Sequence, residues 1–62
     1  MYKLETDDVE VCLTPHGDEW ELWVDHKGYH SVSVWGEKWD MLLLARTIAS
    51  IARGELEEVE EV

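Results

Sequence analysis

Alternation of apolar and polar side chains over residues 20–34, interrupted only by Trp23 and the turn, constrains this chain more than any other feature. The stretch WELWVDHKGYHSVSV carries apolar residues at every second position on both sides of one glycine. Asp25 and Gly28 fit a type I turn followed by a left-handed residue, which closes a three-residue hairpin loop. The stretch therefore predicts a β-hairpin in which Asp25 pairs with Tyr29.

This pairing divides the side chains of the hairpin between two faces of a sheet, because successive strand side chains point to opposite sides. A two-residue loop would mix apolar and polar residues on each face. The apolar face is predicted to hold Trp20, Leu22, Val24, His30, Val32 and Val34. The opposite, outer face is predicted to hold Glu19, Glu21, Trp23, Asp25, Tyr29, Ser31 and Ser33.

A second hairpin precedes the first one. Residues 9–14 alternate in the same way, and residues 15–18 (PHGD) predict a four-residue loop that pairs Leu13 with Trp20. Both turns then place the same residues on one apolar face, which supports the assignment of the sheet. Residues 1–5 can form a short strand if residues 6–8 form a turn or bulge that resets the face.

A helix is predicted to begin after Gly36 and to end at Arg53, before Gly54. Its predicted apolar stripe consists of Met41, Leu44, Ala45, Ile48, Ile51 and Ala52, flanked by Leu42 and Ala49. We therefore expect an α+β fold in which a three-stranded antiparallel β-meander carries one C-terminal α-helix on one face (βββα). Residues 1–54 form this domain, and residues 55–62 form an acidic C-terminal tail or a frayed extension of the helix.

Charge and cysteine content limit the setting in which the chain can work. Five basic and fifteen acidic residues give the 62-residue chain a net charge of −10, which argues against direct binding of nucleic acid or of anionic membranes. Cys12 is the single cysteine, so no internal disulfide can form. With no signal peptide or membrane-spanning run in the sequence, we expect a cytoplasmic, intracellular location.

The sequence offers no pattern typical of catalysis or of metal binding. Neither Cys-x-x-Cys nor His-Glu-x-x-His spacing occurs, and there is no glycine-rich phosphate loop. The predicted register places Cys12 and His30 on opposite faces of the sheet, so they do not share an ion. We expect a non-enzymatic protein with no cofactor and no metal.

Four tryptophans in so short a chain indicate a binding surface, because exposed aromatic side chains ringed by polar groups are typical of interface hot spots. Trp39 and Leu43 form an i,i+4 pair that points away from the helical stripe. These aromatic side chains could also simply cover their own domain. The predicted partner-binding residues are Glu10, Glu19, Glu21, Trp23, Asp25, Tyr29, Trp35, Trp39 and Leu43.

Two functional hypotheses follow. In the first, the chain is an inhibitor whose acidic, aromatic face docks on a basic surface of a partner protein, such as a nucleic-acid-binding groove. Its sharpest form is a nucleic-acid mimic of the kind that phages use against host defence, including anti-CRISPR proteins; the analogy rests on size and charge. In the second, the chain is a structural subunit that associates with its own copy as a homodimer or within a larger assembly.

Overall fold

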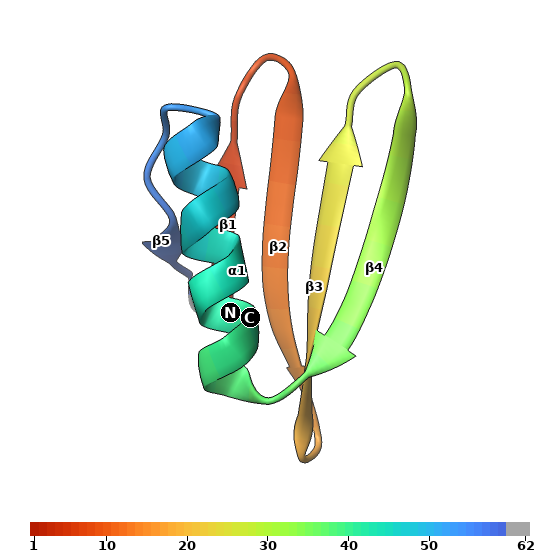
Figure 1. The fold of residues 1–62 in the computed structure, drawn as a ribbon, viewed down its shortest axis with the longest axis vertical. Coiled ribbons are helices and arrows are strands. Elements are labelled where there is room, and N and C mark those ends of the chain that lie inside the picture. Colours follow the sequence, from red (N-terminus) through yellow and green to blue (C-terminus); the bar gives the residue numbers. More distant parts are fainter. Residues whose placement is uncertain (60–62) are drawn as a thin grey trace.

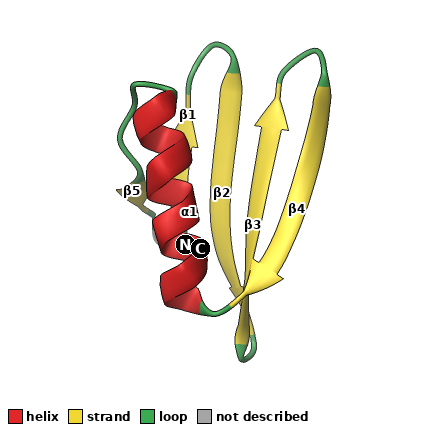
Figure 2. Ribbon diagram, in the orientation of Figure 1, coloured by secondary structure: helices red, strands yellow, loops and turns green. Residues whose placement is uncertain are grey.

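The computed structural model describes residues 1–59, which form one antiparallel sheet and one helix (Figure 1). The helix lies in a separate layer across one face of the sheet (Figure 2). The strands stand side by side in the order β4-β3-β2-β1-β5. The elements are β1 (Tyr2–Glu5), β2 (Val9–His16), β3 (Glu19–His26), β4 (His30–Gly36), α1 (Lys38–Ile51) and β5 (Glu57–Glu58). We call the sheet face under α1 the inner face and the opposite one the outer face.

The prediction of a three-stranded meander is wrong, because the sheet has five strands. The amino-terminal segment is a full member of the sheet: Leu4 pairs with Val11 and is only 7% exposed. The turn that precedes β2 resets the face as expected, since the Thr6 hydroxyl accepts hydrogen bonds from the amides of Asp8 and Val9. Burial of Leu4 beneath the helix stabilises β1. The sequence does not reveal this contact, because β1 has only four residues and their alternation is too short to predict it.

The fifth strand comes from the predicted acidic tail. Glu57 and Glu58 pair with Lys3 and Tyr2 of β1, and the Val59 amide donates to the Met1 carbonyl over 2.8 Å. Leu56, just before β5, packs against the core. The tail was predicted over residues 55–62, of which residues 60–62 lie outside the described part of the chain.

In the β3–β4 hairpin, each residue of β3 pairs with a residue of β4 that lies two positions further along the chain than predicted. The Tyr29 amide donates to the His26 carbonyl over 2.9 Å, so that His26 pairs with His30, and Asp25 no longer pairs with Tyr29. Gly28, with a φ of 87°, takes the third position of this turn, which a type II turn reserves for glycine. A shift of two residues leaves every strand side chain on its predicted face.

The β2–β3 hairpin shows the same two-residue shift. His16 pairs with Glu19 around a two-residue loop, and Pro15 lies within β2 opposite Trp20 rather than in the turn. Because β1 begins opposite Leu13, no strand among the described residues pairs with Pro15 on that side. Proline is tolerated at such a sheet edge, where no ladder hydrogen bond is lost.

The core lies between α1 and the inner face of β1, β2 and β3. Its buried members are Leu4, Val11, Leu13, Leu22, Met41, Leu42, Ala45 and Ala49. The predicted helical stripe is partly wrong, since Leu44 is 43% exposed and Ile51 is 78% exposed. Leu42 and Ala49, which were predicted only to flank the stripe, are buried instead, in a core to which Leu4 and Leu56 add apolar surface.

Helix α1 ends two residues before the predicted position. The amides of Arg53 and Gly54 donate to the carbonyls of Ser50 and Ala49, which is the hydrogen-bond pattern of a Schellman motif. Arg53, with a φ of 59°, occupies the left-handed position that is usually glycine. Gly54 is needed for a different reason: a Cβ atom there would lie 2.5 Å from Cδ1 of Leu4.

We predict opposite effects for substitutions at these two adjacent positions. Gly54→Ala should lower the free energy of unfolding by about 1–3 kcal/mol, because the new methyl group overpacks the contact with Leu4. Arg53→Gly should raise it by about 1 kcal/mol, since glycine removes the cost of the left-handed conformation. Urea unfolding followed by tryptophan fluorescence measures both. A neutral Gly54→Ala would contradict the close packing of Gly54 on Leu4.

Candidate protein-binding face on the outer side of the sheet

The outer face is strongly acidic and carries aromatic side chains. Each strand contributes every second residue to it, because the pleat alternates. Six carboxylates lie on this face, and the cations that reach it are Lys3 and Lys27. The face comprises Lys3, Glu5, Glu10, Cys12, Thr14, His16, Glu19, Glu21, Trp23, Asp25, Ser31, Ser33, Trp35 and Glu57.

Three carboxylates stand side by side on adjacent strands. Glu5 pairs with Glu10, and Glu10 pairs with Asp25. Like charges directly opposite one another destabilise a sheet. Two lysines relieve part of this repulsion: Lys27 Nζ lies 3.1 Å from Glu5 Oε2, and Lys3 Nζ lies 3.8 Å from Glu10 Oε2. The ammonium groups of both lysines are thus paired with Glu5 and Glu10, and among residues 1–59 no ion pair is formed by Asp25.

The hydrogen bond and the positive charge of Lys27 hold the pKa of the Glu5 carboxyl below its usual value. The same contact raises the pKa of the Lys27 ammonium. Lys27 Nζ also donates to the Thr6 carbonyl over 3.0 Å, which ties the β3–β4 turn to the β1–β2 turn. This exposed ion pair therefore links the two hairpin ends at one end of the acidic face.

The middle of the outer face holds Trp23. It stands between Cys12 on β2 and Ser33 on β4, and its ring is half-buried. Burial raises the pKa of the Cys12 thiol, and the neighbouring charge of Glu10 raises it further. A raised pKa disfavours the thiolate, so this cysteine has the opposite of the environment that activates a nucleophile.

Glu21 is the carboxylate with the most contacts on this face. Its Oε1 atom lies 3.1 Å from His16 Nε2, and its Oε2 atom accepts a hydrogen bond of 2.5 Å from the Ser33 hydroxyl. The ring of Trp35 packs on the His16 ring, with centroids 4.8 Å apart and planes tilted by 40°. These contacts fix Glu21 and hold Trp35, half of whose surface is exposed, against the end of β2.

The predicted partner-binding residues do not form one surface. Tyr29 lies in the β3–β4 turn, stacked on His26 with centroids 4.4 Å apart, and so lies outside the rows of the sheet. Trp39 and Leu43 are exposed on α1, on the opposite side of the sheet, with Lys38 Nζ 5.2 Å from the Trp39 ring. The structure brings together on the outer face Glu10, Glu19, Glu21, Trp23, Asp25 and Trp35.

Sequence reasoning missed one of the residues that position Glu21. His16 was predicted in a loop, whereas the observed β2 extends to His16 and brings its ring next to Glu21. The predicted pairing of Asp25 with Tyr29 sets Ser33 opposite Glu21; in the observed register Ser33 pairs with Trp23 and contacts Glu21 diagonally. The alternation of the strands could have placed Lys3 beside Glu10 once β1 was accepted as a strand.

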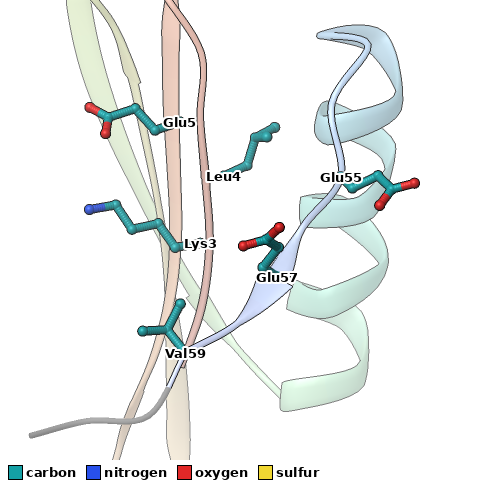
Figure 3. A pocket seen from close by; sticks show the side chains of 6 residues that line it. All are labelled: Lys3, Leu4, Glu5, Glu55, Glu57 and Val59. Carbon is teal, nitrogen blue, oxygen red and sulfur yellow. The ribbon is translucent and has the colours of Figure 1, made fainter.

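A hollow of about 390 Å³ lies at the β1–β5 edge (Figure 3). Lys3 and Glu5 point to one side of β1, and Leu4 points to the other side, towards the helix. Glu55 lies on the helix side and points away from Lys3 and Glu5. Its charged groups therefore do not converge on one point, as a catalytic or metal site requires. Within residues 1–59, no group of three His, Cys, Asp or Glu side chains is placed to hold a metal ion.

In the part of the chain that the structure describes, no helix has the length and apolar character needed to cross a membrane. Comparisons of the chain with protein-family models, with curated proteins and with solved structures found no match.

We predict that Glu5 titrates below pH 4.5 and that this depends on Lys27. In Lys27→Met, the midpoint of the Glu5 carboxyl should move back towards 4.5, because the hydrogen bond and the charge are lost. Since the folded pKa is lowered, the stability that the pair contributes is present above pH 4.5 and is lost as the pH falls through the folded pKa. Carbon-detected NMR titration of both proteins measures the midpoints. Equal midpoints would contradict the ion pair.

We also predict that Cys12 reacts slowly with iodoacetamide. The native protein should be alkylated more slowly than the same chain unfolded in urea at the same pH, because burial disfavours the thiolate. Glu10→Gln should increase the native rate only in part, since the charge of Glu10 is the smaller cause. Mass spectrometry of the alkylated fraction gives the rates. A native rate equal to the unfolded rate would show that the thiol is neither buried nor perturbed.

Proposed function

We propose that this protein is a small non-enzymatic binding module whose acidic outer face docks on a basic surface of a partner protein. The observation that carries the proposal is the row of Glu5, Glu10 and Asp25 on three adjacent strands. Like charges directly opposite one another repel, and the ion pairs of Glu5 and Glu10 with Lys27 and Lys3 offset only part of this repulsion. A partner rich in lysine and arginine would turn this repulsion into attraction.

The aromatic residues support the same face. Trp35 is half exposed and held in place by His16, while Trp23 lies half-buried in the middle of the face. A preordered aromatic side chain binds at a lower cost in conformational entropy than a mobile one. Tryptophan is also among the residues most enriched in interface hot spots. The proposed contact therefore has aromatic anchors surrounded by carboxylates that steer the approach.

In its sharpest form, the proposal is that the outer face mimics nucleic acid and inhibits by occupying the groove of a nucleic-acid-binding protein. Carboxylates repeat at about 4.8 Å across the strands and at about 7 Å from Glu19 to Glu21 along β3. A regular, rigid array of negative charge is what a groove that binds the phosphate backbone recognises. An anti-defence role, such as that of an anti-CRISPR inhibitor, would fit a protein of this size and charge. The site of action in this proposal is the cytoplasm.

The test compares two triple variants that change the net charge equally. Glu5→Gln, Glu10→Gln and Asp25→Asn remove the three charges of the row from the outer face, whereas Glu37→Gln, Asp40→Asn and Glu55→Gln remove three from the helix side. Partners are captured from lysate on the wild-type chain, identified by mass spectrometry, purified and measured by calorimetry. The outer-face variant should bind at least about tenfold more weakly, which corresponds to 1.4 kcal/mol, and the control variant should bind like the wild type.

Salt gives an independent criterion. Binding of the wild type should weaken steeply between about 0.05 and 0.5 M NaCl, because salt screens attraction between exposed opposite charges. The outer-face variant should show a shallower salt dependence than the control variant. Binding that does not change with salt, or equal losses in both triple variants, would overturn the proposal.

A further inference from the structure

Helix α1 exposes a row of large apolar side chains on the side that faces away from its own sheet, next to the polar residues Arg46 and Ser50. Its sequence, KWDMLLLARTIASI, contains three charged residues in fourteen. Trp39, Leu43 and Ile51 are 71%, 66% and 78% exposed, and together with Thr47 they recur every four residues along one row of the helix. A helix that is apolar around most of its circumference is typical of one that is buried on both sides.

The inner face of β4 is uncovered as well. Val32 and Val34 are 49% and 42% exposed, although their partners on β3 are Val24 and the buried Leu22. Strands lie about 4.8 Å apart and a helix is about 10 Å across, so one helix covers about two strands of a sheet. In Figure 2, α1 lies towards β1 and β5, and β4 forms the opposite edge. The β4 edge of the inner face therefore has room for a second helix, which would pack beside α1 on Val32 and Val34.

The side of α1 next to this space is also apolar. Arg46 and Ser50 line a hollow with Leu56, so that side of the helix faces the segment before β5. Leu44 and Ile48 lie on the other side of α1 at 100° per residue and therefore face β4. Leu44 is 43% exposed, and Ile48 is only partly buried. Leu44, Ile48, Val32 and Val34 thus border one uncovered apolar surface.

Charge is distributed so that another copy of the chain can approach this side. Residues 30–54, which include β4 and α1, carry three basic and two acidic side chains, a net charge of +1 that leaves −11 for the rest of the chain. Two copies that meet through their outer faces would bring these acidic surfaces together. Two copies that meet through the helix sides keep them apart, on opposite outer surfaces of the pair.

We propose that a second copy of this chain covers the helix side, with its α1 seated on Val32 and Val34. By twofold symmetry, each helix packs on its own sheet with one side and on the partner's sheet with the other. The dimer then has three layers: two helices side by side between two sheets. Its two acidic outer faces point into solvent, which makes the dimer bivalent if the proposed function holds; the dimer itself does not depend on that function.

The exposed apolar area is large enough for such a dimer. A large side chain offers roughly 150–250 Å² when fully exposed, so the exposed apolar residues of β4 and α1 together expose on the order of 600 Å². That equals the largest apolar patch of a typical monomer, and about 800 Å² per partner is buried in a standard interface. A domain of this size also gains more from association than a larger one, because its own core is small. The residues summed are Val32, Val34, Trp39, Leu43, Leu44 and Ile51.

Sedimentation equilibrium tests the state of association. At about 100 µM the wild type should sediment at twice the 7.2 kDa mass of the chain, and the dimer should tighten in about 0.5 M NaCl as repulsion is screened. The double variant Leu43→Gln, Ile51→Gln should weaken dimerisation at least about tenfold. Tyr29→Ser, which changes an equally exposed apolar residue in the β3–β4 turn, should not. A monomeric wild type, or equal dimerisation of the wild type and the double variant, would overturn the proposal.

A mixing experiment tests the arrangement of the two copies. Val34→Lys and Leu43→Glu place opposite charges on the two surfaces that meet, and each variant alone should be monomeric at the concentration at which the wild type is a dimer. An equimolar mixture should restore a heterodimer, because one of its contacts pairs lysine with glutamate and the other is wild type. Circular dichroism checks that both variants fold. Folded variants that stay monomeric in the mixture would overturn the seating of α1 on Val34.

Discussion

One helix of fourteen residues has to cover a sheet of five strands, and the rest of the structure depends on how it does so. Ala45 and Ala49 face the sheet and let the helix approach Val11, Leu13 and Leu22 closely. The helix turns towards β1, because Leu4 and Leu56 lie on that side. The cost of this choice is that β4 and the far side of α1 keep apolar surface in contact with water. Both the stability of the domain and the dimer that we propose depend on this one packing arrangement.

Charge is distributed as unevenly as apolar surface. The outer face collects carboxylates on adjacent strands, whereas the segment from β4 to the end of α1 carries almost no net charge. Folding alone does not explain the acidic row, because neighbouring carboxylates destabilise the sheet that carries them. Lys3 and Lys27 offset the repulsion at Glu10 and Glu5 but form no ion pair with Asp25 within residues 1–59. Departures from local stability of this kind are expected at functional surfaces, which is why we propose that the outer face binds a partner.

The sequence was informative about faces and less so about register and strand number. Alternation placed Leu22 inside and Trp23 outside, and a register error of two residues left both where they were predicted. It did move Tyr29 into the turn, because Gly28 occupies the third turn position and not the fourth. The contact of Glu21 with His16 was out of reach, because His16 was predicted in the loop between β2 and β3 and in fact lies in β2.

The sequence by itself determined the features that follow a periodic pattern. These are the apolar side of each strand, the part of the chain that forms the helix, and the acidic character of the outer face. These features depend on neighbours in the chain, and turn residues and alternation encode them locally. The tertiary structure decided that the two ends of the chain pair as β1 and β5, which completes a five-stranded sheet. It also decided which side of α1 is buried. Both outcomes depend on apolar contacts between residues far apart in sequence, such as Leu4 and Gly54, and no local pattern encodes those contacts.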